Sequence, residues 1–367
     1  MKARKAETRE VDSPEVKARR SRARGGKQSK VNESRAPSST VSPRTPAAAT
    51  TSRQPAVAVI GAGRLGSALA LALGQSGYPV VALVARRAAR ARHAARALSP
   101  RPLVLDATRL DLLPDTVDLI LVTTPDDQIA EVAARLAGVV AARRRPQQHR
   151  RPRVALHASG ALPSDALAPL GEQGFSLGSL HPLVSISDPR TGAQSLRGAF
   201  YCLEGEARAL TVARQIVRAL GGRSFSIAAR NKSLYHAAAV ITSGHTVALF
   251  SLAAELLARC GLGDAGTRQV LLPLLASTLE NLKSRAPDEA LTGTFARADL
   301  RTVRKHLDAL EGVENVQGAT AVYALLGERS LDMAARRRKF DPAVAEEIAA
   351  LLRRALRGSM KSSAGDD

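Results

Sequence analysis

The chain has 367 residues, of which 45% are hydrophobic and 24% are charged, so it is long enough for two domains and apolar enough for packed cores. Its two cysteines exclude a disulfide scaffold and fit a reducing compartment such as the cytoplasm. We expect no membrane span, because no uninterrupted apolar run reaches the ~18 residues that a span needs. Aromatic residues make up only 3%, which disfavours a protein that stacks single-stranded bases.

The net charge of +21 is spread along the chain. Residues 1–54 carry 14 Lys and Arg against 5 Asp and Glu, a net of +9, and the remaining residues carry +12. Such a charge attracts polyanions without regard to sequence. We attribute it to an Ala- and Arg-rich composition, because no nucleic-acid motif surrounds the arginine clusters. Nucleic acid is therefore expected to bind non-specifically at most.

Residues 1–54 are rich in Lys, Arg, Ser, Pro and Ala and contain almost no large apolar residues. Such a segment buries too little surface to offset the entropy of ordering, so we predict a disordered basic tail. An over-long gene start and a basic tether are the alternatives.

From Ala56 to His157, short apolar runs alternate with helical segments. The runs show no polar alternation, which is typical of parallel strands covered on both faces. The predicted strands are 56–60, 80–85, 103–106, 118–123 and 154–157, and the predicted helices are 67–75, 88–98 and 129–137. This order predicts a Rossmann-type α/β fold, doubly wound around a mostly parallel sheet.

Residues 174–227 predict three further strands, at 176–180, 199–203 and 224–227, around a helix over 207–220 that two glycines end. After Ala228 the apolar spacing becomes helical, over 231–260, 266–283, 300–311 and, as a last basic helix, 334–357. The predicted domains are thus a tail at 1–54, a Rossmann domain at 55–228, an all-helical substrate or dimerisation domain at 229–330, and a basic helix with a frayed end at 331–367.

A GxGxxG motif lies directly between a predicted strand and a predicted helix, in the run Gly61-Ala62-Gly63-Arg64-Leu65-Gly66. In a dinucleotide-binding loop, Gly61 permits the tight turn, Gly63 lets a pyrophosphate approach the backbone, and Gly66 lets helix and strand pack closely. Free N–H groups at the helix start supply the anion site. The alternative is a glycine turn in an unrelated α/β fold.

The end of the second strand indicates which dinucleotide binds. An NAD site has an Asp or Glu about 20 residues after the first glycine, but no acidic residue occurs between Gly61 and Leu105. Arg86 and Arg87 follow the strand instead, and guanidinium groups bind a 2′-phosphate through paired hydrogen bonds. We therefore expect NADP rather than NAD, with Arg64 as a further phosphate contact. The alternative is that these arginines only belong to a basic surface.

Six stretches resemble the bacterial proteins that join a Rossmann-like domain to the domain of unknown function 2520. They are residues 61–66, 124–129, 157–162, 178–183, 232–240 and 290–293, within about 55–323. Ketopantoate reductase, pyrroline-carboxylate reductase and hydroxyacid dehydrogenases with a helical second domain are relatives of this family. The resemblance implies a Rossmann domain, a helical second domain, NADP-dependent oxidoreduction and, by analogy with the relatives, a homodimer.

The chain departs from the family pattern at three positions. Gly244, Thr294 and Ala298 stand where that pattern has Asn, Pro and Gly. In the related reductases an Asn at the first of these positions helps to hold the substrate. The substrate contacts of this chain are therefore expected to differ.

One face of the helix that Asn231 is expected to cap carries polar groups. At 100° per residue, Lys232, His236 and Ser243 point in the same direction. The resemblance implies that a lysine at position 232 lies by the reacting carbonyl or imine. We expect Lys232 or His236 to donate a proton to the reacting heteroatom, with Ser243 as a third candidate. The alternatives are a solvated lysine, a packed histidine and a hydroxyl bonded to its own helix.

Two loops follow predicted strands at the edge where an open α/β sheet binds its ligand. Thr124 and Pro125 are expected near the nicotinamide or its ribose, and Ser159 and Gly160 against cofactor or substrate. Asp126 is expected to cap the helix that follows. No spacing of His, Cys and carboxylates predicts a metal site.

These observations predict an NADP-dependent oxidoreductase that transfers hydride to or from a small carbonyl or imine substrate. We expect an anionic substrate, because the rim of its pocket is expected to be basic. The alternative is a non-catalytic dinucleotide-binding sensor, which the departures at positions 244, 294 and 298 leave open. The expected partners are the substrate and a second copy of the chain.

Overall fold

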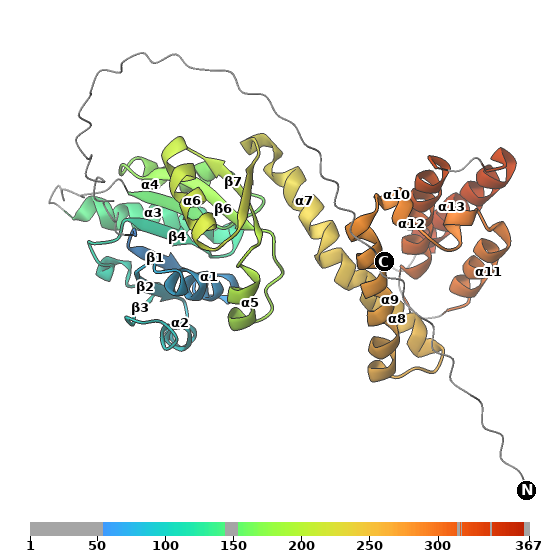
Figure 1. Cartoon of the computed structure of the whole chain (residues 1–367), viewed down its shortest axis with the longest axis horizontal. Coiled ribbons are helices and arrows are strands. Elements are labelled where there is room, and N and C mark those ends of the chain that lie inside the picture. Colours follow the sequence, from blue (N-terminus) through green and yellow to red (C-terminus); the bar gives the residue numbers. More distant parts are fainter. Residues whose placement is uncertain (1–53, 144–152, 314–315, 317, 338–339, 363–367) are drawn as a thin grey trace, which may run out of the picture. The chain divides into compact units, whose positions relative to one another are not determined.

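The computed structural model describes residues 54–143, 153–313, 316, 318–337 and 340–362 (Figure 1). The predicted basic tail lies outside the described residues except for Gln54. The last ten residues were expected to fray, but 358–362 are helical, and 363–367 lie outside the described residues. The described residues form a sheet with helices, followed along the chain by a helical region.

Eight strands form one sheet in the order β3-β2-β1-β4-β5-β6-β7-β8. Their bounds are β1 Val57–Ile60, β2 Val80–Ala85, β3 Leu103–Asp106, β4 Leu119–Val122, β5 Val154–His157, β6 Ser176–Pro182, β7 Phe200–Gly205 and β8 Arg223–Ser226. All neighbours pair in parallel except β6 and β7, which are antiparallel. The predicted doubly wound, mostly parallel sheet is confirmed.

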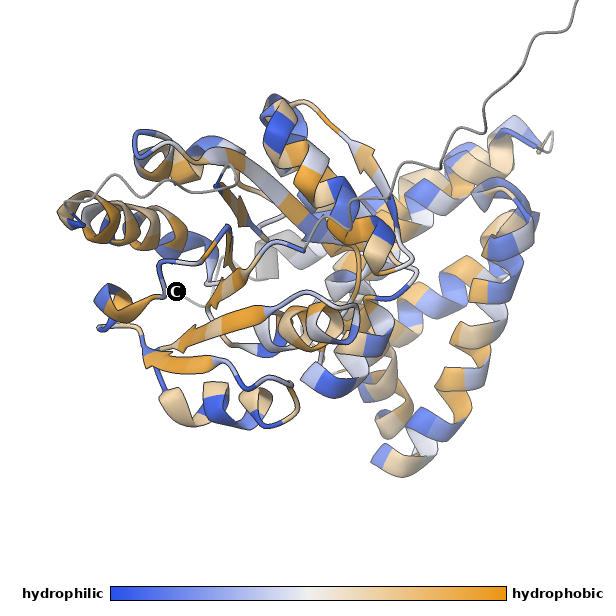
Figure 2. Cartoon of the chain, turned by 60° about the vertical axis from the view of Figure 1, so that its left-hand side comes forward, coloured by the Kyte–Doolittle hydropathy of each residue, from blue (hydrophilic) through white to orange (hydrophobic). Residues whose placement is uncertain are grey.

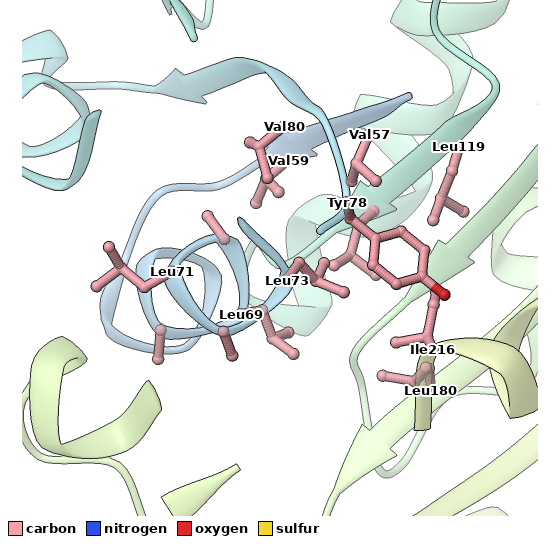
Figure 3. Close-up of a cluster of buried hydrophobic side chains, with 14 of the residues drawn as sticks. Val57, Val59, Leu69, Leu71, Leu73, Tyr78, Val80, Leu119, Leu180 and Ile216 are labelled. Atoms are coloured by element: carbon pink, nitrogen blue, oxygen red, sulfur yellow. The ribbon is translucent and has the colours of Figure 1, made fainter. Parts of the chain in front are cut away.

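Helices cover both faces of the sheet, because alternate residues of a strand point to opposite sides. Val57 and Val59 of β1 belong to the core that includes α1 (Arg64–Gln75), α2 (Ala88–Ala95) and α6 (Ala207–Ala219). Ala58 and Ile60 belong to the core on the other face, with α3 (Asp126–Ala142) and α4 (Ala168–Gly171). Figure 3 shows the first core, and several strands are hydrophobic along their length in Figure 2.

The chain after β8 is helical, as predicted. Its helices are α7 Lys232–Thr242, α8 Gly244–Arg259, α9 Asp264–Ser284, α10 Pro287–Ala290, α11 Leu300–Glu311, α12 Ala319–Ala335 and α13 Pro342–Ser362. Val303, Leu307, Leu331 and Leu352 lie at the centre of a separate core formed by α11, α12 and α13. Helix α12 runs across residue 330, where the sequence placed a domain boundary.

The predicted single helix over 231–260 is interrupted. Ser243 has φ −107° and ψ −72° and separates α7 from α8. Gly244 favours a helix poorly, and the Thr242 and Thr246 hydroxyls bond to carbonyls four residues earlier, which bends helices. Asn231 is the N-cap residue of α7, as expected, but its side chain makes no capping hydrogen bond.

The predicted last helix over 334–357 is wrong in its start. Residues 319–335 form α12, and a new helix, α13, begins at Pro342. Proline suits the first position of a helix because its missing N–H would have no partner there. Asp341 supports this start by accepting a hydrogen bond from the N–H of Ala343 at 2.9 Å.

The segment Ala229–Arg259 has 31 residues and contains a stretch with a mean hydropathy of 1.5, so by length and composition alone it could cross a membrane. Polar residues such as Lys232 and Ser243 are scattered through it, so it contains no uninterrupted apolar run of that length. The expectation of no membrane span stays a prediction. Much of its apolar surface is exposed in the single chain.

Gly66 packs where no side chain fits, since a Cβ there would lie 2.2 Å from the Gly61 carbonyl oxygen and 2.4 Å from Thr123 Oγ1. We expect Gly66→Ala to lower the free energy of unfolding by about 1–3 kcal/mol, the usual cost of overpacking. Urea denaturation measures the change. Gly138→Ala in α3 is the matched control, because a Cβ there meets nothing within 4 Å. A Gly66→Ala variant as stable as the control would contradict the close packing of β1 and α1.

Candidate functional site

The predicted phosphate loop connects β1 to α1. Gly61 has a φ of +111°, which favours glycine, and a Cβ there would lie 2.7 Å from Thr124 N. Helix α1 begins at Arg64 after the N-cap Gly63, with no side chain capping it, so its first N–H groups are free to meet an anion. A Cβ on Gly63 would come no nearer than 3.9 Å to its neighbours. Packing within the protein therefore requires Gly61 but leaves open space at Gly63.

A cavity of about 800 Å³ opens over this loop, and we call it the loop cavity. Of the predicted cofactor residues, its lining includes Gly61, Ala62, Gly63, Arg86, Arg87, Thr124 and Pro125. Arg64, Leu65, Gly66, Ser159 and Gly160 are not part of that lining. The structure adds Arg90 and Arg135, which the sequence reasoning missed. Arg90 lies one helical turn after Arg86, so helical spacing could have found it.

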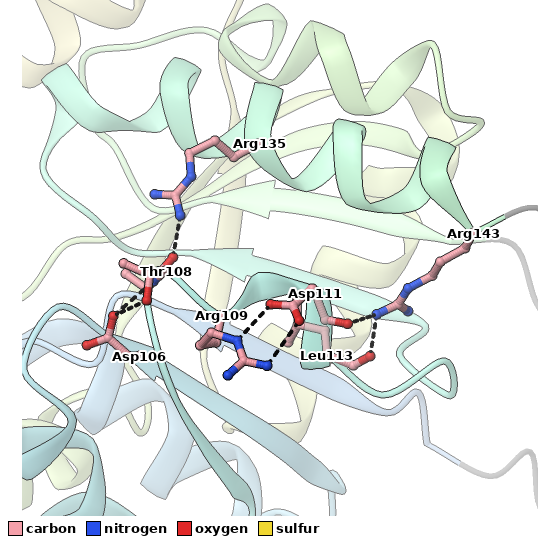
Figure 4. Close-up of polar contacts among 8 residues, drawn as sticks. Asp106, Thr108, Arg109, Asp111, Leu113, Arg135 and Arg143 are labelled. Carbon is pink, nitrogen blue, oxygen red and sulfur yellow. Dashed lines mark hydrogen bonds and ion pairs between the residues drawn. The ribbon is translucent and has the colours of Figure 1, made fainter.

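Arg135, in α3, lines the loop cavity. Its guanidinium donates a hydrogen bond to the Ala107 carbonyl just after β3 (Figure 4). The turn there is closed by Asp106, which accepts from the N–H and the hydroxyl of Thr108, both at 2.9 Å. These two hydrogen bonds lower the pKa of Asp106. The side wall of the cavity is thus fixed by bonds between segments distant in sequence.

The loop after β4 supplies an unpartnered hydroxyl. Thr123 Oγ1 donates to the Gly61 carbonyl at 2.9 Å, which ties this loop to the phosphate loop. The next hydroxyl, Thr124 Oγ1, is buried and has no hydrogen-bond partner. Buried polar atoms normally have partners, so Thr124 fits a place where a ligand completes the bonding.

The loop after β5 is held by Ser159. Its Oγ donates to Asp126 Oδ2 at 2.8 Å and accepts from the N–H groups of Ala161 and Leu162 at 3.1 and 3.0 Å. The predicted cap role of Asp126 is wrong, because Pro125 is the N-cap of α3 and no side chain caps that helix. Asp126 instead links the loops after β4 and β5.

His157 is a packed, neutral histidine at the end of β5. One ring nitrogen hydrogen-bonds the Pro163 carbonyl at 3.0 Å and the other accepts from the N–H of Ser159 at 3.2 Å. Burial lowers the pKa of His157 to about 4. Its two bonds hold the loop over residues 157–163.

Lys232, the first residue of α7, is only 1% exposed. Its Nζ donates to the Ser159 carbonyl at 3.0 Å and to Ser179 Oγ at 2.9 Å. Ser179 is also bonded to the buried carboxylate of Glu204, at 3.4 Å. Burial lowers the pKa of Lys232, and the nearby Cys202 and Glu204 act in the opposite direction. The buried ammonium therefore fastens α7 to the carboxyl ends of β5 and β6.

Two histidines meet beside Gly160. A Cβ on Gly160 would lie 2.3 Å from His236 Nδ1 and 2.9 Å from His181 Nε2, so only glycine fits. His181 Nδ1 is hydrogen-bonded to the Tyr235 hydroxyl at 2.6 Å, and burial lowers the pKa of His181 to about 4. His236 Nδ1 is buried without a partner, like Thr124 Oγ1 in the loop after β4.

A second cavity, of about 480 Å³, opens between the end of β6 and α7, and we call it the α7 cavity. Its lining contains two of the three predicted catalytic residues, His236 and Ser243, but not Lys232. His181 and Tyr235 also line it, and sequence reasoning did not assign them to the reaction. The expected basic rim is not found there, because no Lys or Arg belongs to the lining that the structure describes.

Solved structures share this fold. A Thermotoga maritima protein has 24% sequence identity and a TM-score of 0.57, and the match covers 77% of this chain and all 100% of that one. A Bacteroides fragilis protein named for NADP oxidoreductase activity has 23% identity and a TM-score of 0.60, over 76% of this chain and 99% of that one. No curated protein matches the chain in sequence.

Two family models match separate parts of the chain. The Rossmann-like domain matches residues 41–182, and the domain of unknown function DUF2520 matches residues 199–330. The predicted family is confirmed, and the chain belongs to the proteins that carry a Rossmann-like domain followed by DUF2520.

Proposed function

We propose that this chain is an NADP-dependent oxidoreductase that transfers hydride to or from a small carbonyl or imine compound. The loop cavity carries the proposal, because it joins the start of α1, the open space at Gly63 and the side chains of Arg86 and Arg87. The oxidoreductase name of the Bacteroides fragilis protein with the same fold supports it.

The residues around the loop cavity fit a dinucleotide with a 2′-phosphate. The free N–H groups at the start of α1 suit the pyrophosphate, and Arg86, Arg87 and Arg90 lie on the side that follows β2, where the adenosine ribose belongs. The unpartnered hydroxyl of Thr124 suits the nicotinamide half. When bound, NADPH supplies the hydride.

His236 is the proton donor that the geometry favours. His236 lines the α7 cavity and its Nδ1 is buried beside Gly160 without a partner, whereas Lys232 Nζ already has two acceptors. We therefore assign His236 to hold a proton at the reacting heteroatom and Lys232 to position α7. Ser243 lies exposed after the end of α7, at the far side of the cavity.

A cofactor-binding sensor is the second candidate function. Gly244 lines the α7 cavity at the position where the family pattern has Asn, so no side-chain amide is present there to hold a substrate. Turnover of a carbonyl or imine probe separates the two functions, because a sensor binds NADPH without consuming it.

We also propose that the chain works as a homodimer in the cytoplasm. Large apolar side chains on α7, α8 and α9 are 40–76% exposed, namely Leu234, Ile241, Val247, Leu249, Val270, Leu272, Leu274, Leu279 and Leu282. Exposed apolar surface of this extent marks an interaction site. A second copy presents the same helices, so a two-fold pair buries both sets against each other.

The double variant Arg86→Glu/Arg87→Asp tests the cofactor assignment. We expect its Kd for NADPH to rise about 10²- to 10⁴-fold, since each of the two lost charge-assisted hydrogen bonds contributes about 1.5–3 kcal/mol, with little change for NADH. Fluorescence titration measures both. Arg109→Glu is the control, because Arg109 pairs with Asp111 on the surface and does not line the loop cavity. Unchanged NADPH affinity in the double variant would show that both arginines are bystanders.

Substitutions of His236 and Lys232 separate chemistry from positioning. We expect His236→Asn to bind NADPH normally and to reduce a panel of 2-oxo acids, ketones and cyclic imines about 10²- to 10⁴-fold more slowly. Lys232→Met should instead lower the free energy of unfolding by about 1–3 kcal/mol, because it leaves the buried Ser159 carbonyl and Ser179 hydroxyl without their donor. Stopped-flow absorbance of NADPH and thermal melting are the measurements. Full turnover by His236→Asn would refute its role, and a wild type that binds NADPH but turns over no probe would favour the sensor.

Charged substitutions on the apolar helices test the dimer. We expect the wild type to show the mass of two chains in light scattering and Val247→Asp/Leu274→Asp to show the mass of one, because the buried carboxylates would lack partners. Leu112→Asp is the control, because Leu112 is also exposed (46%) but lies outside α7, α8 and α9. This variant should leave the dimer intact. A wild type that is monomeric and floats with lipid vesicles would assign the segment Ala229–Arg259 to a membrane instead.

A further inference from the structure

We infer that the α7 cavity binds the uncharged, apolar part of a neutral ketone or imine rather than a carboxylate. This inference rests on the proposed function and names the class of substrate for it. It differs from the anionic substrate that the sequence suggested, because the arginines that suggested an anion line the loop cavity instead.

The lining of the α7 cavity is apolar over most of its length. Pro182, Leu183 and Val184 form the wall that follows β6, and the alanines and Val240 of α7 form the other. Among the lining residues that the structure describes there is no Lys, Arg, Asp or Glu. A carboxylate moved from water into such surroundings loses solvation without gaining a partner, which is strongly unfavourable.

The nearest buried cation is not available to a substrate. Lys232 Nζ is bonded to the Ser159 carbonyl and Ser179 Oγ, and the lysine does not line the cavity. At the start of α8, the N–H of Ser243 bonds to the Ala239 carbonyl and that of Val247 bonds to the Ser243 carbonyl. No side chain caps this helix, so the cavity offers a carboxylate uncharged backbone donors near Gly244 but no side-chain cation among the described lining residues.

One end of the cavity is polar and suits the reacting heteroatom. His236 Nδ1 has no partner there, and His181 and Tyr235 are bonded to each other at 2.6 Å. Burial keeps the pKa of His181 at about 4, so this ring brings no positive charge at neutral pH. A carbonyl oxygen or imine nitrogen placed at His236 leaves its substituent against the apolar walls.

A matched pair of probes tests this inference. Benzylacetone is a neutral ketone, and in 2-oxo-4-phenylbutyrate a carboxylate replaces its methyl group. We expect the full-length chain with NADPH to bind benzylacetone at least about tenfold more tightly than the acid in ligand-observed NMR. The values of kcat/KM should follow the same order.

A new cation in the wall should reverse this preference. Leu183 is 37% exposed, so Leu183→Arg can be accommodated, and we expect it to shift the ratio of the two affinities at least about tenfold towards the acid. Leu183→Gln changes polarity without charge and should leave the order unchanged. Leu112→Arg adds the same charge outside the cavity and should also leave it unchanged.

Three results would overturn the inference: tighter binding of the acid by the wild type, no binding of either probe, or an unchanged ratio in Leu183→Arg. Failure of the proposed function is distinguishable, because it shows as a loss of NADPH binding. Probe binding measured without NADPH still decides the inference in that case.

Discussion

The buried ammonium of Lys232 links the helical region to the sheet. It satisfies the Ser159 carbonyl after β5 and Ser179 in β6, and through Ser179 it is coupled to the buried Glu204. This places α7 against the carboxyl ends of the strands, where an open α/β sheet binds ligands. His236 follows one helical turn later and meets His181 beside Gly160. The imidazole end of the α7 cavity therefore depends on a lysine that does not line it.

Local signals were sufficient for the sheet and the phosphate loop. The central strands β1, β2 and β4 are short apolar runs, and Gly61 and Gly66 are required by contacts within the turn or with the loop after the adjacent strand β4. The break at Ser243 was harder to locate because the sequence has only a weak signal there, whereas the start of α13 carries a local signal, Pro342 after Asp341, that the prediction passed over. The apolar character of α7 and α8 continues through the break, so hydrophobic spacing could not locate it.

Local sequence signals located some of the site residues but not others. Arg86 and Arg87 were found because they follow a predicted strand, but Arg135 reaches the loop cavity from α3 and no local spacing indicates this. His181 and His236 meet only because the fold brings the first turns of α7 to β6, where Lys232 bonds to Ser179. Lys232 and His236 share a helix face, but Lys232 is buried whereas His236 is only half-buried. Sequence periodicity does not report this difference.

Two of the three departures from the family pattern, those at Ala298 and Gly244, have structural counterparts. Ala298 has a φ of 51°, in the left-handed region where the glycine of the family pattern would be unstrained. Gly244 leaves the α7 cavity without a side chain at one corner. The departure at Ala298 concerns backbone conformation, and the departure at Gly244 concerns the substrate. Only the departure at Gly244 bears on the reaction, and it agrees with a cavity that offers few polar contacts.

The most direct measurement of the central claim is calorimetric titration of the wild-type chain with NADPH and with NADH. A loop cavity that holds a pyrophosphate and a 2′-phosphate predicts saturable binding of NADPH, at least about tenfold tighter than that of NADH. Absence of heat with either nucleotide, or tighter binding of NADH, would contradict it.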